Sequence, residues 1–201
     1  PKILFISYAF YPSMGGIEVN SAILTDYFHQ KGYDLKLVTM VEEEGNRKFP
    51  FPVFRNPGLS QLCKLHKWAD LVFENNPSLR LAWPRLFFTS TSVIALCGRI
   101  SRDDGKLAVQ DRLKGLALRN ADAVVAVSAA IRDKFCSKAI IIGNPYRHDL
   151  FLTLDRDRKP LNFVFLGRLI SSEGVDLAIG VCNRIVYKVS SCLLYTSQTA
   201  D

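Results

Sequence analysis

The first forty residues most constrain the fold, because they follow the order strand, glycine loop, helix, strand. Lys2–Ser7 is an almost unbroken apolar run, which is typical of a strand buried on both faces. The pair Gly15-Gly16 lies in the loop that follows, and Ile17–Gln30 has helical spacing. Asp34–Met40 is the next apolar run. This pattern predicts a βαβ unit with two parallel strands and a right-handed crossover.

The predicted first helix has a recognisable apolar face and a recognisable end. Val19, Ile23 and Tyr27 are four residues apart and therefore share one face of the helix. Gly32 follows as the expected C-terminal cap.

The rest of the first 150 residues continues the alternation of strand and helix. Val41–Leu59 is rich in charge, Pro and Gly, which predicts a loop. Ser128 is the expected N-cap of the predicted helix Ala129–Phe135. The predicted helices are Ser60–Trp68, Lys106–Asn120 and Ala129–Phe135, and the predicted strands are Asp70–Phe73, Leu86–Thr89, Ala123–Val127 and Ala139–Ile142. We therefore expect an α/β protein with a Rossmann-like, doubly wound parallel sheet.

The second part of the chain is predicted to start a new domain. Residues 1–150 form the first domain, and the charged stretch 151–161 is the expected linker. Residues 162–183 contain one strand and one helix, the first βα unit of a second domain that the chain does not complete. Residues 184–201 have no clear helical period, and we expect them to be foreign to the fold.

Composition and charge argue against several classes of protein. The net charge is +7, but Lys and Arg are scattered and not interleaved with aromatics, so nucleic-acid binding is not favoured. No apolar run reaches the roughly 18 residues that cross a bilayer, and the first residues do not resemble a signal peptide. The five cysteines show no CxxC spacing, so we expect no disulfides, and reduced thiols indicate a cytoplasmic protein. The three histidines are far apart in sequence, so we expect no bound metal.

The glycine pair before the first helix is the first candidate site. Gly15 and Gly16 would let a ligand approach backbone N–H groups at a helix N-terminus, where the helix dipole favours an anion such as phosphate. The site follows the first strand, at the edge where open α/β sheets bind ligands. The segment is not GxGxxG, which argues against a nicotinamide-binding domain. A tight turn without a ligand is the alternative.

The second candidate is Arg168, which follows the apolar run Asn162–Leu166. An Arg just past a strand end has the fork geometry that binds a diphosphate. A plain surface arginine is the alternative interpretation.

In their order along the chain, these segments resemble the family-4-type glycosyltransferases of the GT-B fold. The matching stretches are PKILFISYAFYPSMGGIE, NADAVVAVSAAIRDKF, IIIGNPYRHDLF and NFVFLGRLISSEGVDLAI, and the resemblance covers roughly residues 1–183. It implies two Rossmann-like domains, with the acceptor on the first and most of the nucleotide-sugar donor on the second. It also implies transfer with retention, and neither a cofactor nor a metal.

The resemblance also assigns expected roles to single residues. Gly15, Gly16 and Arg168 match positions that contact the donor phosphates. Apart from the resemblance, Glu18, Thr89 and Asn144 are candidates for acceptor contacts or for shaping the hinge, and a partner of the helix dipole is the alternative for Glu18. No catalytic residue is assigned.

This sequence departs from the family pattern in three places. Glu173 stands where many members have a phosphate-binding Lys. Phe88, before Thr89, aligns with a strand-end His of many members. The late carboxylate-bearing donor segment is absent.

The function expected from the sequence is transfer of a sugar from a nucleotide sugar to a glycan, a lipid-linked or a small-molecule acceptor. This chain alone is expected to be inactive, because most of the donor pocket is missing. The basic surface favours peripheral contact with the inner face of a membrane. Two alternatives remain: a non-catalytic phosphate- or nucleotide-binding Rossmann-like domain, and another Rossmann-type enzyme such as a sugar-nucleotide epimerase.

Overall fold

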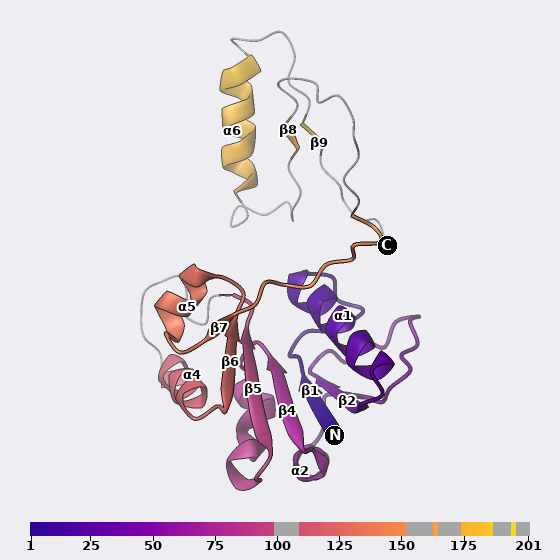
Figure 1. Cartoon of the computed structure of the whole chain (residues 1–201). Helices are drawn as coiled ribbons and strands as arrows, with labels where there is room; N and C mark the ends of the chain where they lie inside the picture. Colours follow the sequence, from indigo (N-terminus) through magenta and orange to yellow (C-terminus); the bar gives the residue numbers. More distant parts are fainter. Residues whose placement is uncertain (99–108, 152–162, 165–173, 187–193, 196–201) are drawn as a thin grey trace. The chain divides into compact units, whose positions relative to one another are not determined.

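A computed structural model of the chain describes residues 1–98, 109–151, 163–164, 174–186 and 194–195 (Figure 1). The chain divides into two compact units, Pro1–Phe151 and Leu152–Asp201.

The first unit is built on one parallel sheet of seven strands in the order β3-β2-β1-β4-β5-β6-β7. Neighbouring strands are parallel throughout. The order reverses between β1 and β4, which is the switch point of a doubly wound sheet. The strands are β1 (Lys2–Ile6), β2 (Asp34–Thr39), β3 (Val53–Arg55), β4 (Leu71–Asn75), β5 (Thr91–Leu96), β6 (Ala123–Ala126) and β7 (Ile140–Ile141). The predicted α/β Rossmann-like fold is confirmed.

Helices cover this sheet, and Figure 1 shows α1 beside β1 and β2, and α5 beside β6 and β7. As predicted, the Ser128 hydroxyl caps α5 by accepting a hydrogen bond from Ile131 N at 3.3 Å. Gly32 follows α1 with φ of +80°, a conformation that favours glycine. The helices are α1 (Gly16–Gln30), α2 (Leu59–Trp68), α3 (Leu79–Ala82), the 3₁₀ helix η1 (Trp83–Phe87), α4 (Val109–Arg119) and α5 (Ala129–Phe135).

Strand β1 lies at the centre of the core because its side chains alternate between two apolar layers. Ile3 and Phe5 pack on the α1 side, together with Phe10 and Phe28. Leu4 and Ile6 face the opposite layer. There they meet side chains of α2 and α3, including Leu62, Leu65 and Leu81.

The structure corrects the predicted strand Leu86–Thr89. Trp83–Phe87 is a 3₁₀ helix, and the next strand, β5, begins only at Thr91. Leu86 and Phe87 are about 70% exposed, so this apolar run is not a core element. The polar Ser92 lies within β5, opposite Val72, and the Asp122 carboxylate accepts hydrogen bonds from its N–H and its hydroxyl.

Two other expectations also need correction. Val41–Leu59 is not all loop, since β3 lies within it and pairs with β2. The face of α1 that holds Val19 and Tyr27 is about half exposed, while the helix buries Asn20, Ser21 and Thr25.

The second unit contains one short parallel pair, β8 (Phe163–Val164) with β9 (Leu194–Tyr195), and the helix α6 (Val175–Val186). The predicted strand and helix of residues 162–183 are thus present. The helix was expected over Glu173–Cys182, and α6 ends four residues later, at Val186. A strand also lies in the stretch 184–201, where none was expected.

A buried ion pair joins the end of β4 to η1. Arg85 Nη1 lies 3.0 Å from Glu74 Oε1, with the two side chains 8% and 2% exposed. Arg85 Nη2 also donates to the carbonyl of Ala117 on α4 at 2.8 Å. Burial raises the pKa of Glu74 to about 7, although Arg85 and the N–H of Ser78 offset part of that effect.

This raised pKa predicts a specific dependence of stability on pH. Since the folded-state pKa lies above the ordinary 4.5, Glu74 contributes stability at low pH that is lost as the pH rises from about 4.5 to about 7. Glu74→Gln mimics the protonated carboxyl. We expect the free energy of unfolding of the variant, relative to the wild type, to increase over this range by on the order of 3 kcal/mol. Urea unfolding, followed by fluorescence of Trp68 and Trp83, measures it; a constant difference would contradict the assignment.

Candidate functional site

The loop between β1 and α1 is held by contacts on both of its sides. Phe10 is fully buried and anchors the loop in the α1-side core. The Arg55 guanidinium, at the end of β3, donates to the carbonyls of Tyr11 and Val41 at 2.9 and 3.2 Å. Thr39 Oγ1 donates to the Tyr8 carbonyl at 3.1 Å. These contacts therefore fix the start of α1 at the carboxyl edge of the sheet.

The start of α1 is an uncapped helix N-terminus. Gly15 is the N-cap in extended conformation and makes no side-chain cap. A Cβ added at Gly16 would meet nothing within 4 Å, so the space beside this residue is open. The N–H groups of such a first turn have no partner within the helix and favour an anion.

Glu18 occupies part of this position with its own negative charge. A Cβ at Gly15 would lie 2.6 Å from Glu18 Oε2, so the carboxylate folds back over the N-cap. A first-turn Glu stabilises the helix dipole. An incoming anion must therefore displace a flexible carboxylate from the same place.

A continuous chain of hydrogen bonds links α1 to the ends of three strands. Ser7 Oγ, after β1, donates to the Ala9 carbonyl at 2.6 Å and thus accepts from Ser21 Oγ at 2.8 Å. Asn75 Nδ2, at the end of β4, donates to Ser21 Oγ at 2.6 Å and to the Ile17 carbonyl at 3.2 Å.

The chain continues through Cys97, which directly follows β5. Its thiol donates to Asn75 Oδ1 at 2.9 Å and accepts from Asn20 Nδ2 at 3.4 Å. Asn20 Nδ2 also donates to Asn144 Oδ1 at 3.1 Å, in the loop after β7. We call Ser7, Ser21, Asn75, Cys97, Asn20 and Asn144 the polar chain.

One atom of the polar chain remains available for a ligand. Asn20 is 5% exposed, and its Oδ1 has no hydrogen-bond partner in the part of the chain that the structure describes. Burial raises the pKa of the Cys97 thiol, against a smaller opposing effect of the Asn20 N–H, so the neutral thiol is favoured. A buried oxygen without a partner is costly, and a ligand hydroxyl or N–H would satisfy it.

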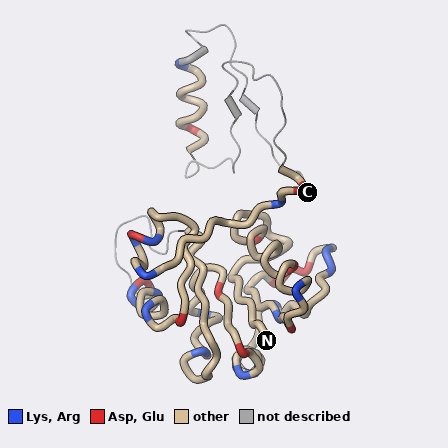
Figure 2. The backbone as a smooth tube through the Cα atoms, in the orientation of Figure 1, with Lys and Arg blue, Asp and Glu red and all other residues tan. Residues whose placement is uncertain are grey.

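A cavity of about 510 Å³ opens at this edge of the sheet, and we call it the carboxyl-edge cavity. Tyr8 and Ala9 line it after β1, Ile17 from the start of α1, and Asn75 after β4. Arg80, Gln110 and Lys114 complete its rim. The two cations and the helix N-terminus together favour an anionic ligand. Elsewhere on this unit, Figure 2 shows basic and acidic residues interspersed.

Most, but not all, of the residues predicted from sequence meet here. Gly15, Gly16 and Glu18 form the start of α1, and Asn144 binds Asn20 in the next turn of that helix. Thr89 is exposed and precedes β5, at the opposite edge of the sheet, so the structure does not bring it to this site. Arg168 and Glu173 lie outside the described residues.

Phe88 was aligned with the strand-end His of the glycosyltransferase family, and this alignment is wrong. Phe88 follows the 3₁₀ helix η1 and ends no strand. The residue that follows the corresponding strand, β5, is Cys97.

Sequence reasoning missed the polar chain apart from Asn144. The available indication was that Ser7, Asn75 and Cys97 each stand at or just past the end of an apolar run. Because carboxyl ends of parallel strands share one edge, these positions could have been grouped. Cys97 was not, because the strand before it was misplaced.

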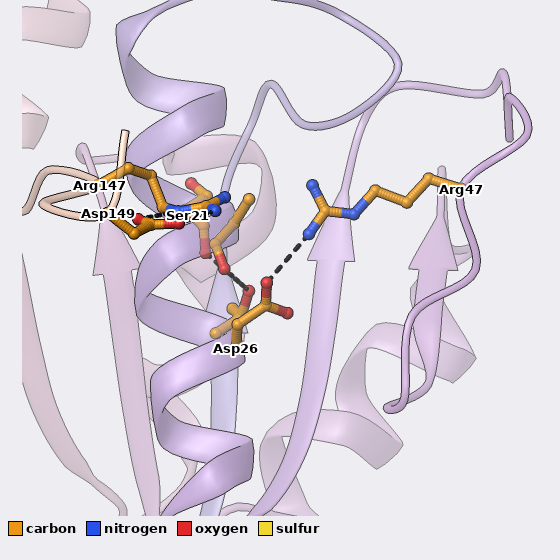
Figure 3. Close-up of polar contacts among 7 residues, drawn as sticks. Ser21, Asp26, Arg47, Arg147 and Asp149 are labelled. Carbon is orange, nitrogen blue, oxygen red and sulfur yellow. Dashed lines mark hydrogen bonds and ion pairs between the residues drawn. The ribbon is translucent and has the colours of Figure 1, made fainter. Parts of the chain in front are cut away.

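A second hollow, of about 600 Å³, lies along the outer face of α1. The apolar face predicted for α1 lines this hollow, through Val19, Ile23 and Tyr27. Figure 3 shows Arg47 reaching Asp26 of α1, with an N–O distance of 2.9 Å, and Arg147 paired with Asp149 beside the helix. Exposed pairs of this kind contribute little to stability.

The described residues contain neither a metal cluster nor a membrane-spanning helix. No group of three or more His, Cys, Asp or Glu side chains there is placed to hold a metal ion. No helix there has both the length and the apolar character that spanning a bilayer requires.

Comparison with known proteins shows similarity of fold. No protein-family model matches the sequence, and no curated protein matches it. The solved structure of Thermosynechococcus elongatus sucrose-phosphate synthase matches 100% of this chain and 63% of its own, with a TM-score of 0.72 and 14% identity. S. aureus TarM, in complex with Fondaparinux, alpha-GlcNAc-glycerol and UDP, matches 97% of this chain and 71% of its own (TM-score 0.70, 9% identity). Anabaena HepE in complex with UDP matches 99% and 70% (TM-score 0.63, 17% identity).

These comparisons define the fold class. The chain has the Rossmann-like α/β architecture of GT-B proteins, and it spans about two thirds of the length of these three.

The polar chain leads to a prediction about stability. Ser21→Ala removes the acceptor of Asn75 Nδ2 and the donor to Ser7 Oγ, both of them buried. We expect a loss of about 2 kcal/mol in the free energy of unfolding. The control Ser60→Ala, on the exposed surface of α2, should cost less than about 0.5 kcal/mol. Equal effects in urea unfolding would show that the buried hydrogen bonds contribute nothing.

Proposed function

We propose that this chain is part of a glycosyltransferase that takes its sugar from a nucleotide sugar. The observation that carries the proposal is the uncapped α1 N-terminus beside the carboxyl-edge cavity, within a GT-B-type fold. UDP is bound in the solved structures of TarM and HepE, which supports a uridine nucleotide as the donor carrier.

The chemistry of the reaction explains the charges around the cavity. When the glycosidic bond to the nucleotide breaks, negative charge develops on the leaving diphosphate. Fixed positive groups lower the energy of that transition state. The N–H groups of Gly16 and Ile17 and the cations Arg80 and Lys114 have the required sign. Arg168 is proposed to act in the same way.

The finer assignments belong to the same proposal. The acceptor is a glycan, a lipid-linked or a small-molecule alcohol, and transfer proceeds with retention and without a metal. Asn20 Oδ1, which is buried and has no partner among the described residues, is proposed to accept a hydrogen bond from a sugar hydroxyl. Residues 1–201 alone are proposed to be inactive, in a cytoplasmic protein with peripheral membrane contact.

The position of the phosphates is tested by a change of one charge at Gly16. Gly16→Asp adds a carboxylate where the structure leaves open space, and Gly16→Asn adds a side chain of the same shape without charge. We expect Gly16→Asp to weaken UDP binding roughly tenfold, since a like charge within several Å costs about 1 kcal/mol or more. Titration calorimetry measures both affinities. If Gly16→Asp and Gly16→Asn bind UDP equally, the phosphates do not lie at α1.

The carboxylate of Glu18 generates a prediction of opposite sign. Glu18→Gln removes the negative charge that lies over Gly15, so we expect UDP to bind about threefold more tightly. The helix itself should lose about 0.5 kcal/mol of stability. Glu44→Gln, on the exposed β2–β3 loop, is the matched control and should leave the affinity unchanged. Weaker binding by Glu18→Gln would instead make the carboxylate part of the ligand site.

A further inference from the structure

A separate hollow of about 280 Å³ lies between η1 and α4, and we call it the η1–α4 hollow. Its walls are mostly apolar and are contributed by both helices and by α3. The apolar wall residues include Leu79, Ala82, Trp83, Leu86, Leu113 and Leu116. The sheet side of the hollow is different, because Glu74, Ser78 and Arg85 line it there.

Two of these three polar side chains are committed to each other. The Glu74–Arg85 pair is buried, and Arg85 also donates to the Ala117 carbonyl. Glu74 Oε2 accepts from the Ser78 N–H at 3.3 Å. The opposite charges compensate one another, so the floor of the hollow attracts neither a cation nor an anion strongly.

The third polar group, the Ser78 hydroxyl, is available. Ser78 is 6% exposed, and its Oγ has no hydrogen-bond partner among the described residues. Nor does Ser78 cap α3, although it stands at the N-cap position. Buried hydroxyls in folded proteins nearly always have a partner, which points to a ligand group at this position.

The hollow adjoins the carboxyl-edge cavity. Pro77, Ser78 and Leu79 line both, so this segment is a common wall. A molecule in the hollow with a polar end at Ser78 would hold that end beside the candidate site.

We propose that the η1–α4 hollow binds the apolar part of the sugar acceptor, a small alkyl or aryl alcohol whose hydroxyl group lies at Ser78. The identification as acceptor rests on the proposed function; the binding of such an alcohol does not. The volume suits roughly ten non-hydrogen atoms, taking about 30 Å³ for each. A carbohydrate ring is disfavoured, because apolar walls would leave most of its hydroxyls unpaired.

The indole N–H of Trp83 reports directly on occupation of the hollow. The chain has two tryptophans, and Trp68, the last residue of α2, packs against the core and does not line the hollow. In nuclear magnetic resonance spectra of the full chain, we expect 2-phenylethanol to shift the Trp83 signal in a saturable way. The Trp68 signal should stay unchanged. Trp83→Phe assigns the two signals.

Variants separate the apolar and the polar parts of the site. Leu116→Lys places a charge at the half-exposed rim and should weaken 2-phenylethanol binding at least tenfold. Val109→Lys, on the same helix and outside the hollow, is the control and should change nothing. Ser78→Ala should weaken 2-phenylethanol about fivefold, the effect of one net hydrogen bond, and leave ethylbenzene binding unchanged.

Three outcomes would overturn the proposal or limit it. A Trp83 shift that does not saturate, or that Leu116→Lys leaves intact, shows only surface contact and overturns the site. Equal loss of 2-phenylethanol and ethylbenzene in Ser78→Ala overturns the place of the hydroxyl. If 2-phenylethanol binds as expected but UDP binding is the same in Gly16→Asp and Gly16→Asn, the hollow stands and its role as an acceptor site falls.

Discussion

Polar side chains end three neighbouring parallel strands of this sheet, and α1 must satisfy them. Ser7, Asn75 and Cys97 stand at or directly after the ends of β1, β4 and β5, in a region that α1 covers. Each would be costly to bury without a partner. Ser21 and Asn20 supply the partners, so the helix lies on the sheet with polar residues inward. The same contacts fix where the N-terminus of α1 points, and the candidate site follows from that.

The Glu74–Arg85 pair has a comparable role on the other side of β4. Arg85 joins the strand end to η1 through Glu74 and to α4 through the Ala117 carbonyl. A buried pair of this kind gives little net stability, but breaking it leaves an uncompensated charge. The pair instead fixes the position of residues 77–79, because Glu74 also accepts from the Ser78 N–H. These residues separate the carboxyl-edge cavity from the η1–α4 hollow. Two cavities of different character, one rimmed by cations and one apolar, can therefore adjoin without merging.

The sequence predicted the elements whose cause is local. The apolar run of β1, the helical spacing of α1, the Gly32 cap and the Ser128 cap all appear where expected. The errors arose where a distant partner decides the outcome. Ser92 lies in a strand, where Asp122, thirty residues away, accepts hydrogen bonds from its N–H and its hydroxyl.

The same reason explains the inward face of α1, which no periodicity could have indicated. Ser21 and Asn20 are buried because Asn75, Cys97 and Asn144 are their partners, more than fifty residues away. Misplacing β5 then hid Cys97 as a strand-end residue. The place of Gly15 and Gly16 at the start of α1 could be predicted, because glycine before a helix has a local physical meaning, whereas phosphate contact there stays a prediction.

The position of Glu18 connects these constraints to the chemistry. Its carboxylate folds over Gly15 although the space beside Gly16 is open, which is what an electropositive helix start favours in an anionic group. The side chain thus stands in for the anion that the geometry attracts. A donor phosphate would take its place at the cost of one flexible rotamer, and on departure the carboxylate would return. Under the proposed function, this internal charge would help the site release a diphosphate product, because the helix N-terminus regains a partner when the ligand leaves.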